Sequence, residues 1–185
     1  MDAFITPPRR IPWYLRAGIW IANRTTGMDL LLPKLLAWYP KAAISSGIME
    51  ALVAHHDGEL DERMLKLVRV TVSLSVSCPF CIDMNSHGYQ ESGISDEEMS
   101  ALRGLLDLED VSTLKPRERL GIQYARFASL TPLYFPEEFI DQIKGHFNPR
   151  EIVILASTAA QVNYWARLLQ ALGVPPAGYS EQCEI

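Results

Sequence analysis

Apolar residues recur at helical spacing along most of the chain and predict a protein built from helices. The segment from Leu60 to about Ser75 shows this most clearly, because it carries a broad apolar face. The run from Val68 to Val76 is rich in β-branched residues, as strands are, but its surroundings are helical. No stretch alternates apolar and polar residues regularly enough to predict a strand. We therefore expect an all-α fold.

Helix start and stop signals divide the rest of the chain. Ser95 followed by Glu98 forms a capping box, which predicts a short helix to about Leu106. Asn148, Pro149 and Glu151 predict the start of a long helix, which reaches about Leu172. Other helices are expected over Trp13 to about Asn23, Ile44 to His55, Cys78 to about Ser92, Pro116 to Leu130 and Pro136 to Lys144.

The N-terminal segment differs from the rest in its prolines and aromatic residues. Three prolines within the first 12 positions predict an extended arm, which leads into the helix that starts at Trp13. We therefore divide the chain into residues 1–40, an arm and a helix packed on the body, and residues 41–185, a helical domain. Trp13, Tyr14 and Trp20 favour contacts with another subunit, so we expect a homo-oligomer.

Composition and charge exclude several classes of partner. The 185 residues are 48% apolar and 21% charged, which is ordinary for a globular protein. The net charge of −5 and the lack of any run of Lys and Arg argue against nucleic acid. No apolar stretch is long enough to cross a membrane, and the N-terminus lacks the apolar core of a signal peptide. We expect a cytoplasmic protein without a membrane partner.

The chemistry of the chain is concentrated in Cys78-Pro79-Phe80-Cys81 at a predicted helix start. The free N–H groups and the dipole at a helix N-terminus favour the thiolate, which is the form that attacks peroxides and disulfides. The second cysteine can then close a disulfide. Pro79 suits the first helical position. In a reducing compartment such a pair is more often catalytic or metal-binding than structural.

Two alternatives to redox chemistry stay open for this pair. The cysteines can be small buried core residues without reactivity. They can also join His87 in a zinc site, although a structural zinc needs four ligands and no second ligand pair follows. Cys183 lies near the C-terminus as a free thiol, and His55-His56 lacks the usual ligand spacing. We expect neither a metal nor a cofactor.

The stretch from Leu65 to Leu102 resembles the core of the carboxymuconolactone decarboxylase family, in its alkyl hydroperoxidase D-like branch. The residues that carry the resemblance are the apolar helix, the C-x-x-C pair and the motif that runs from Gly93 to Leu102. The resemblance implies a compact all-α domain that assembles as a trimer or hexamer. It also implies reduction of small hydroperoxides, with a lipoylated protein or a thioredoxin-like carrier as the dithiol reductant.

The resemblance also implies a proton relay, and the chain departs from it at both positions. The family has Glu twelve residues before the first cysteine, where this chain has Lys66, and His four residues after the second, where it has Asn85. A tight turn at residues 75–77 would bring Lys66 and Asn85 opposite each other. Asn85 cannot exchange protons at useful pH, whereas His87, paired with Asp83 one helical turn earlier, is a candidate substitute.

Two assignments of the attacking thiol and two functions follow. Exposure at the helix terminus favours Cys78 as the attacking thiol, whereas the resemblance assigns attack to Cys81 and disulfide closure to Cys78. We follow the resemblance and predict a thiol-dependent peroxidase or disulfide oxidoreductase. The alternative is a redox-sensing or binding protein on the same scaffold that has lost the relay. Lactone decarboxylation, which named the family, does not depend on a C-x-x-C pair.

Overall fold

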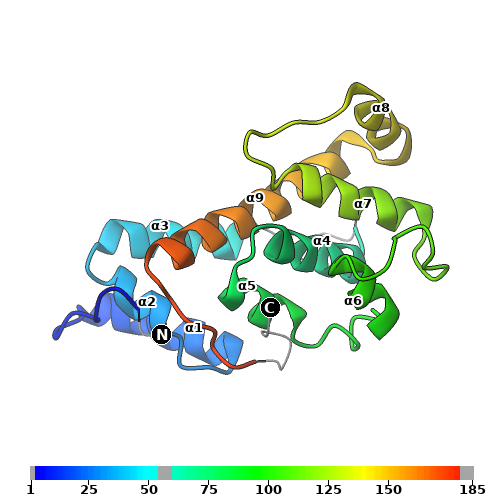
Figure 1. Ribbon diagram of the computed structural model, residues 1–185. Coiled ribbons are helices and arrows are strands. Elements are labelled where there is room, and N and C mark those ends of the chain that lie inside the picture. Colours follow the sequence, from blue (N-terminus) through cyan, green and yellow to red (C-terminus); the bar gives the residue numbers. More distant parts are fainter. Residues whose placement is uncertain (1–2, 54–59, 180–185) are drawn as a thin grey trace.

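The computed structural model describes residues 3–53 and 60–179. Within these ranges the chain forms nine helices and no strand, which confirms the all-α fold (Figure 1). His55, His56 and Cys183 lie outside the described residues. In chain order the helices are α1 (Trp13–Thr26), α2 (Leu31–Leu36), α3 (Pro40–Leu52), α4 (Glu62–Ser75), α5 (Pro79–Ser86), α6 (Asp96–Leu102), α7 (Pro116–Phe127), α8 (Glu137–His146) and α9 (Pro149–Ala171).

Helix α4 lies at the centre of the body, where it packs against α5, α6, α7 and α9. Its side chains enter two apolar clusters. Leu65, Val68 and Val72 pack with residues of α7, α8 and α9, while Leu67 and Val70 pack with α6 and the segment that follows it. Neighbours on several sides explain why the apolar face is broad, and why a β-branched stretch folds as a helix here.

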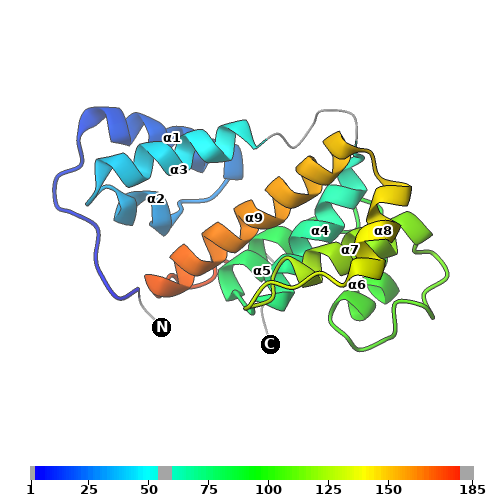
Figure 2. The same cartoon turned by 90° about the horizontal axis from the view of Figure 1, so that it is seen from above.

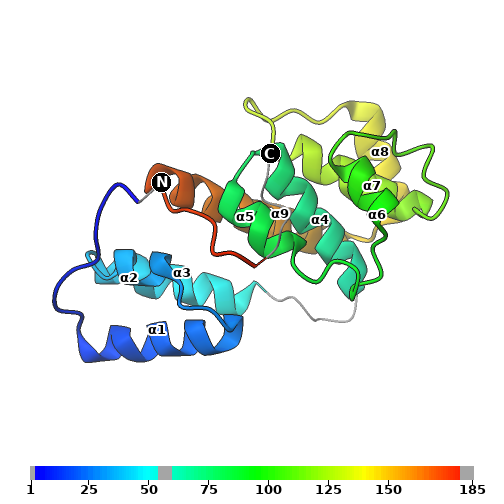
Figure 3. The same ribbon diagram turned by 60° about the horizontal axis from the view of Figure 1, so that its bottom comes forward.

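Helices α1, α2 and α3 form a separate layer, which we call the N-terminal layer (Figure 2). Figure 3 shows α1 on the outer side of this layer, with α2 and α3 between it and α9. Trp13 and Trp20 on α1 are 80% and 64% exposed. Since α3 packs with α1 and α2, the layer extends past residue 40, and the domain division at that residue stays a prediction.

The cap signals place most helix starts correctly. The predicted capping box is present at Ser95, and the helix start predicted at Asn148 also has a capping box. The predicted ends are less accurate, and α5 ends at Ser86 instead of about Ser92. His87 has an extended backbone and Gly88 is left-handed at φ 66°, so the helical hydrogen-bond ladder stops there. Likewise α6 ends at Leu102, shortly before the left-handed Gly104.

Removal of the cap of α9 should weaken the fold measurably. The Asn148 side chain accepts the N–H of Glu151 at 2.9 Å, and the Glu151 carboxylate accepts the N–H of Asn148 at 2.8 Å. We expect Asn148→Ala to lower the free energy of unfolding by about 1 kcal/mol, whereas Asn148→Asp should stay close to wild type. Urea unfolding at neutral pH measures both. An alanine variant as stable as wild type would show that the cap contributes nothing.

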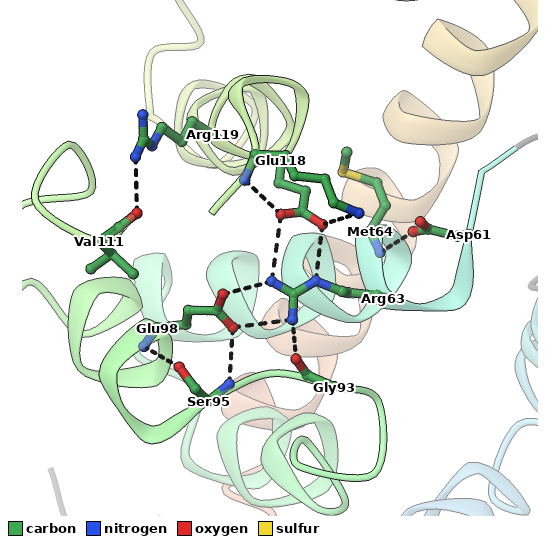
Figure 4. A network of polar contacts seen from close by, with 10 residues as sticks. Asp61, Arg63, Met64, Gly93, Ser95, Glu98, Val111, Glu118 and Arg119 are labelled. Atoms are coloured by element: carbon green, nitrogen blue, oxygen red, sulfur yellow. Dashed lines mark hydrogen bonds and ion pairs between the residues drawn. The ribbon is translucent and has the colours of Figure 1, made fainter. Parts of the chain in front are cut away.

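Arg63 on α4 joins the N-termini of α6 and α7 (Figure 4). Its guanidinium binds Glu98 at 2.7 Å and Glu118 at 2.9 Å, and it also donates to the carbonyl of Gly93. Glu98 accepts the N–H of Ser95, and Glu118 accepts the N–H of Lys115 in the same way. One cation therefore neutralises two carboxylates that are themselves part of helix starts.

Candidate active site

The two cysteines lie across the first turn of α5, in the helix framework predicted for them. Cys78 is the N-cap residue, and its Sγ accepts the N–H of Cys81 at 3.3 Å. The two Sγ atoms are in contact with each other, and the Cα atoms lie 5.2 Å apart, within the usual range for a disulfide. The pair can therefore open and close a disulfide without a large backbone movement.

The predicted exposure of Cys78 is wrong, because both cysteines are buried. Cys78 is 0% exposed and Cys81 is 3% exposed. They belong to an apolar cluster, here called the dithiol cluster, to which α2, α5, α9 and the segment after α9 contribute. Its other buried members are Leu30, Leu32, Leu35, Phe80, Ala166, Leu169 and Val174. The sulfur atoms are thus enclosed by hydrocarbon beneath the N-terminal layer.

Lys66 and Asn85, which occupy the two relay positions, have different partners. The Lys66 ammonium donates to the carbonyl O of His87 at 2.5 Å, and burial followed by the nearby Arg69 lowers the pKa of Lys66. Asn85 donates to the hydroxyl of Ser73 at 2.9 Å. Ser73 lies about two turns after Lys66 on α4, so the two relay positions are not joined to each other as a Glu–His pair would be.

His87 does not replace the missing histidine in this structure. Because α5 ends at Ser86, His87 leaves the helix, and the one-turn spacing from Asp83 no longer sets up a pair on a helix face. The His87 ring packs on Tyr179, and its Nδ1 lies 3.0 Å from the Tyr179 carbonyl O. The buried Asp83 carboxylate accepts the N–H of Gly178 at 2.6 Å. Both residues bind the segment that follows α9.

Sequence reasoning missed a polar group that joins the N-terminal layer to the body. Glu50 of α3 accepts the side-chain N–H groups of Gln161 and Trp165 on α9, both at 2.7 Å. Arg69 of α4 is half-buried and interacts electrostatically with Glu50. Arg69 lies one helical turn after Lys66, so its position on the same helix as a relay position could have been noticed from the sequence. Glu50 is more than 100 residues away from Gln161 and Trp165 in the chain, so the sequence alone gave no indication of these contacts.

An apolar cavity of about 850 Å³ lies away from the cysteines. Its walls come from α7, α9 and the segment before α8, and neither cysteine lines it. Among its lining residues are Tyr124, Phe135 and Tyr164. The cavity therefore does not open directly onto the dithiol.

Two further features of the described residues concern metal ligands and membrane-spanning helices. Among residues 3–53 and 60–179 no group of three or more His, Cys, Asp and Glu side chains is placed to hold a metal ion. His87 turns toward Tyr179 and does not complete a set with the cysteines. Over the same residues, none of the helices combines the length and the apolar character needed to cross a membrane.

Comparisons of sequence point to one family. Residues 43–109 match the model of the carboxymuconolactone decarboxylase family, and this range contains α4, the dithiol and α6. The uncharacterized protein YnjA of Escherichia coli is 25% identical over 178 residues, which cover 94% of each chain. The uncharacterized protein YdfG of Bacillus subtilis is 25% identical over 109 residues, covering 58% of this chain and 72% of that protein.

Solved structures share the fold over nearly the whole chain. An uncharacterized peroxidase-related protein from Ralstonia eutropha, described as an alkylhydroperoxidase AhpD core, has a TM-score of 0.79 at 14% identity, covering 99% of this chain and 95% of its own. The debrominase Bmp8 has a TM-score of 0.81 at 15% identity, covering 98% and 96%. Residues 43–109 thus match the carboxymuconolactone decarboxylase family, and the chain as a whole shares the fold of the alkylhydroperoxidase AhpD core structure.

Proposed function

We propose that this protein is a dithiol peroxidase that reduces small organic hydroperoxides, with Cys81 as the attacking thiol and Cys78 as the resolving thiol. The observation that carries the proposal is the contact between the two Sγ atoms at the N-terminus of α5. Backbone N–H groups and the helix dipole favour a thiolate at this position. The neighbouring thiol lies where it can close the disulfide at once.

The proposed reaction is a two-electron oxidation of the pair. The Cys81 thiolate attacks the peroxide oxygen and forms a sulfenic acid, while the O–O bond breaks and the leaving alkoxide takes a proton to become an alcohol. The Cys78 sulfur then attacks the sulfenic sulfur, which forms the disulfide and releases water. Two electrons from a dithiol carrier, such as a lipoylated or thioredoxin-like protein, restore both thiols.

The surroundings of the dithiol favour organic over inorganic peroxides. Leucine side chains of α2 and α9 enclose the sulfur atoms. The alkyl group of an organic hydroperoxide is stabilised by burial in such surroundings, whereas hydrogen peroxide has no apolar group to bury. The exposed Trp13 and Trp20 support assembly of several copies, and we propose a cytoplasmic homo-oligomer.

Intact mass spectrometry of the reduced protein tests the proposal. One equivalent of cumene hydroperoxide should convert the wild-type chain to a species lighter by about 2 Da, since two hydrogens leave when the disulfide forms. A dithiol such as dihydrolipoamide should restore the original mass. An unchanged mass, in protein whose thiols are shown to be reduced, would contradict a working peroxidatic dithiol.

A redox-sensing role is the second candidate, and the burial of both cysteines favours it. A cysteine residue that is 0–3% exposed meets oxidants only when its surroundings open. A sensor would form the disulfide slowly and would not turn over with dihydrolipoamide and excess peroxide. Measurement of both the first oxidation and the steady-state rate separates the sensor from the peroxidase.

Because the chain shares its fold with a debrominase, brominated aromatic compounds should be tested as substrates beside hydroperoxides. Replacement of bromine by hydrogen on an aromatic ring also takes two electrons, which a dithiol supplies as it becomes a disulfide. Bromide release from a brominated pyrrole, without oxidation by hydroperoxide, would assign the dithiol to dehalogenation. We favour the hydroperoxide because the leaving alkoxide requires only a proton.

A further inference from the structure

The cavity between α7, α9 and the segment that links α7 to α8, here called the α7–α9 cavity, has the size of a ligand site. Its volume of about 850 Å³ lies within the range of small-molecule pockets, roughly 300–1,000 Å³. The linking segment leaves α7 beside α9 (Figure 1), where the Asn163 amide N–H donates to the hydroxyl of Ser129 at 3.3 Å. The Tyr164 hydroxyl shares a hydrogen bond of 2.9 Å with Ser46 of α3. These contacts hold the walls in place and favour a preformed cavity.

The face of α9 that lines this cavity changes from apolar to polar along its length. Ala156 and Ala160 lie one turn apart, and their short side chains leave space. Asn163 and Arg167 follow about one and two turns further toward the C-terminus of the helix. At a rise of about 1.5 Å per residue, about 16 Å separate Ala156 from Arg167 along the helix. The lining is therefore long, with hydrocarbon at one end and a guanidinium at the other.

The walls that face α9 are also apolar. The rings of Tyr124 on α7 and Phe135 in the linking segment have centroids 5.0 Å apart. Ala128 and Leu133 add hydrocarbon, and Leu133 is 62% exposed. Aromatic and aliphatic walls with few polar groups are typical of sites that bury an apolar ligand. An alkyl chain in this cavity would leave water and would be stabilised by that burial.

Arg167 is the charged residue of the lining, and among the described residues no carboxylate pairs with it. Its guanidinium donates to the hydroxyl of Thr131 at 3.3 Å, which leaves other N–H donors for a ligand. A guanidinium binds a carboxylate through two parallel hydrogen bonds. An exposed arginine beside an apolar cavity therefore suits a ligand with a hydrocarbon body and one terminal carboxylate.

We propose that the α7–α9 cavity binds a medium-chain aliphatic carboxylate, whose carboxylate pairs with Arg167. Its chain lies along Ala156 and Ala160 and is covered by the two aromatic rings. The site goes beyond the proposed function, and it adjoins the dithiol cluster only through Leu168, which packs on both. A free acid fits better than a second copy of this chain, because the surface is hollowed and its one cation lies at an end.

Isothermal titration calorimetry of the full-length protein with decanoate tests the proposal. Decanoate should bind about tenfold more tightly than octanoate, because more of its chain is buried. It should also bind at least about tenfold more tightly than decanol, which has the same chain length but no charge. Arg167→Met should remove this preference for the acid and leave decanol binding unchanged. Lys34→Met removes a cation from α2, outside the lining, and should bind decanoate as the wild type does.

Ala160→Phe tests where the ligand binds. Ala160 is an exposed residue of α9, so the larger ring should fill the cavity without displacing the core, and binding of both decanoate and decanol should be lost. Val153→Phe, on the same helix but outside the lining, is the matched control and should leave binding unchanged. Equal binding of decanoate by the wild type and Ala160→Phe, or no binding by the wild type, would overturn the proposal. In the second case, a smaller assembly mass of Leu133→Glu by light scattering would assign this surface to a second copy of the chain.

Discussion

Arg63→Met should destabilise the protein by about 3–5 kcal/mol, because it leaves two buried carboxylates without their cation. The side chains of Glu98 and Glu118 are only 2% and 4% exposed, so water cannot replace the guanidinium. Both carboxylates also bind backbone N–H groups at helix starts, and the loss therefore extends to α6 and α7. Urea unfolding at neutral pH measures the change.

The pH dependence identifies the cause of this loss. Burial raises the pKa of Glu98, but hydrogen bonds from Arg63, Thr113 and the Ser95 backbone, together with the Arg63 charge, lower it overall. The Arg63–Glu98 ion pair therefore contributes fully to the free energy of unfolding above the ordinary Glu pKa of about 4.3, and this contribution is lost as the pH falls below that value. In Arg63→Met the buried carboxylate can relieve its charge by taking a proton. The difference in free energy of unfolding between Arg63→Met and wild type should therefore become smaller from pH 7 to pH 4.

Lys34→Met is the matched control for the removal of a cation. Lys34 pairs with Asp29, whose side chain is 72% exposed, so the loss should stay below about 1 kcal/mol. If Arg63→Met lowers the free energy of unfolding by no more than Lys34→Met does, the buried network does not hold the starts of α6 and α7 together.

Features that depend on near neighbours in the chain could be predicted from the sequence. The capping boxes at Ser95 and Asn148 involve residues three positions apart, and both are present. The C-x-x-C pair likewise lies within one helical turn, so its place at the start of α5 follows from Pro79 and the turn before it. The apolar spacing of α4 was sufficient to predict a helix in spite of its β-branched residues.

Features set by distant segments could not be predicted in this way. The expected pairing of His87 with Asp83 assumed that the helix continued, but α5 ends early and residues 178 and 179 bind both side chains. Burial of Cys78 depends on α2 and α9, which are far from it in sequence. Glu50 contacts residues more than 100 positions away, so only the fold reveals its hydrogen bonds to α9.

Cys81→Ser should abolish peroxide reduction, with a fall of about a thousandfold or more, because the proposed attacking atom is removed. The remaining Cys78 thiol is the N-cap of α5 and points back to the Cys81 N–H, so in the proposed mechanism it serves to close the disulfide. The variant should keep its reduced mass after addition of hydroperoxide. The rate of peroxide consumption and the intact mass measure the two effects.

Cys78→Ser should give a different product, and this difference assigns the roles. With the resolving thiol absent, Cys81 can still be oxidised and should remain as a sulfenic acid, heavier by about 16 Da, which dimedone traps. Turnover should be lost although the first oxidation persists. Both variants belong in a Cys183→Ser background, which should itself behave like wild type because the pair is proposed to suffice. If the sulfenic acid forms in Cys81→Ser and not in Cys78→Ser, then Cys78 is the attacking residue. The N-cap sulfur, which accepts the N–H of Cys81, would in that case be the activated thiolate.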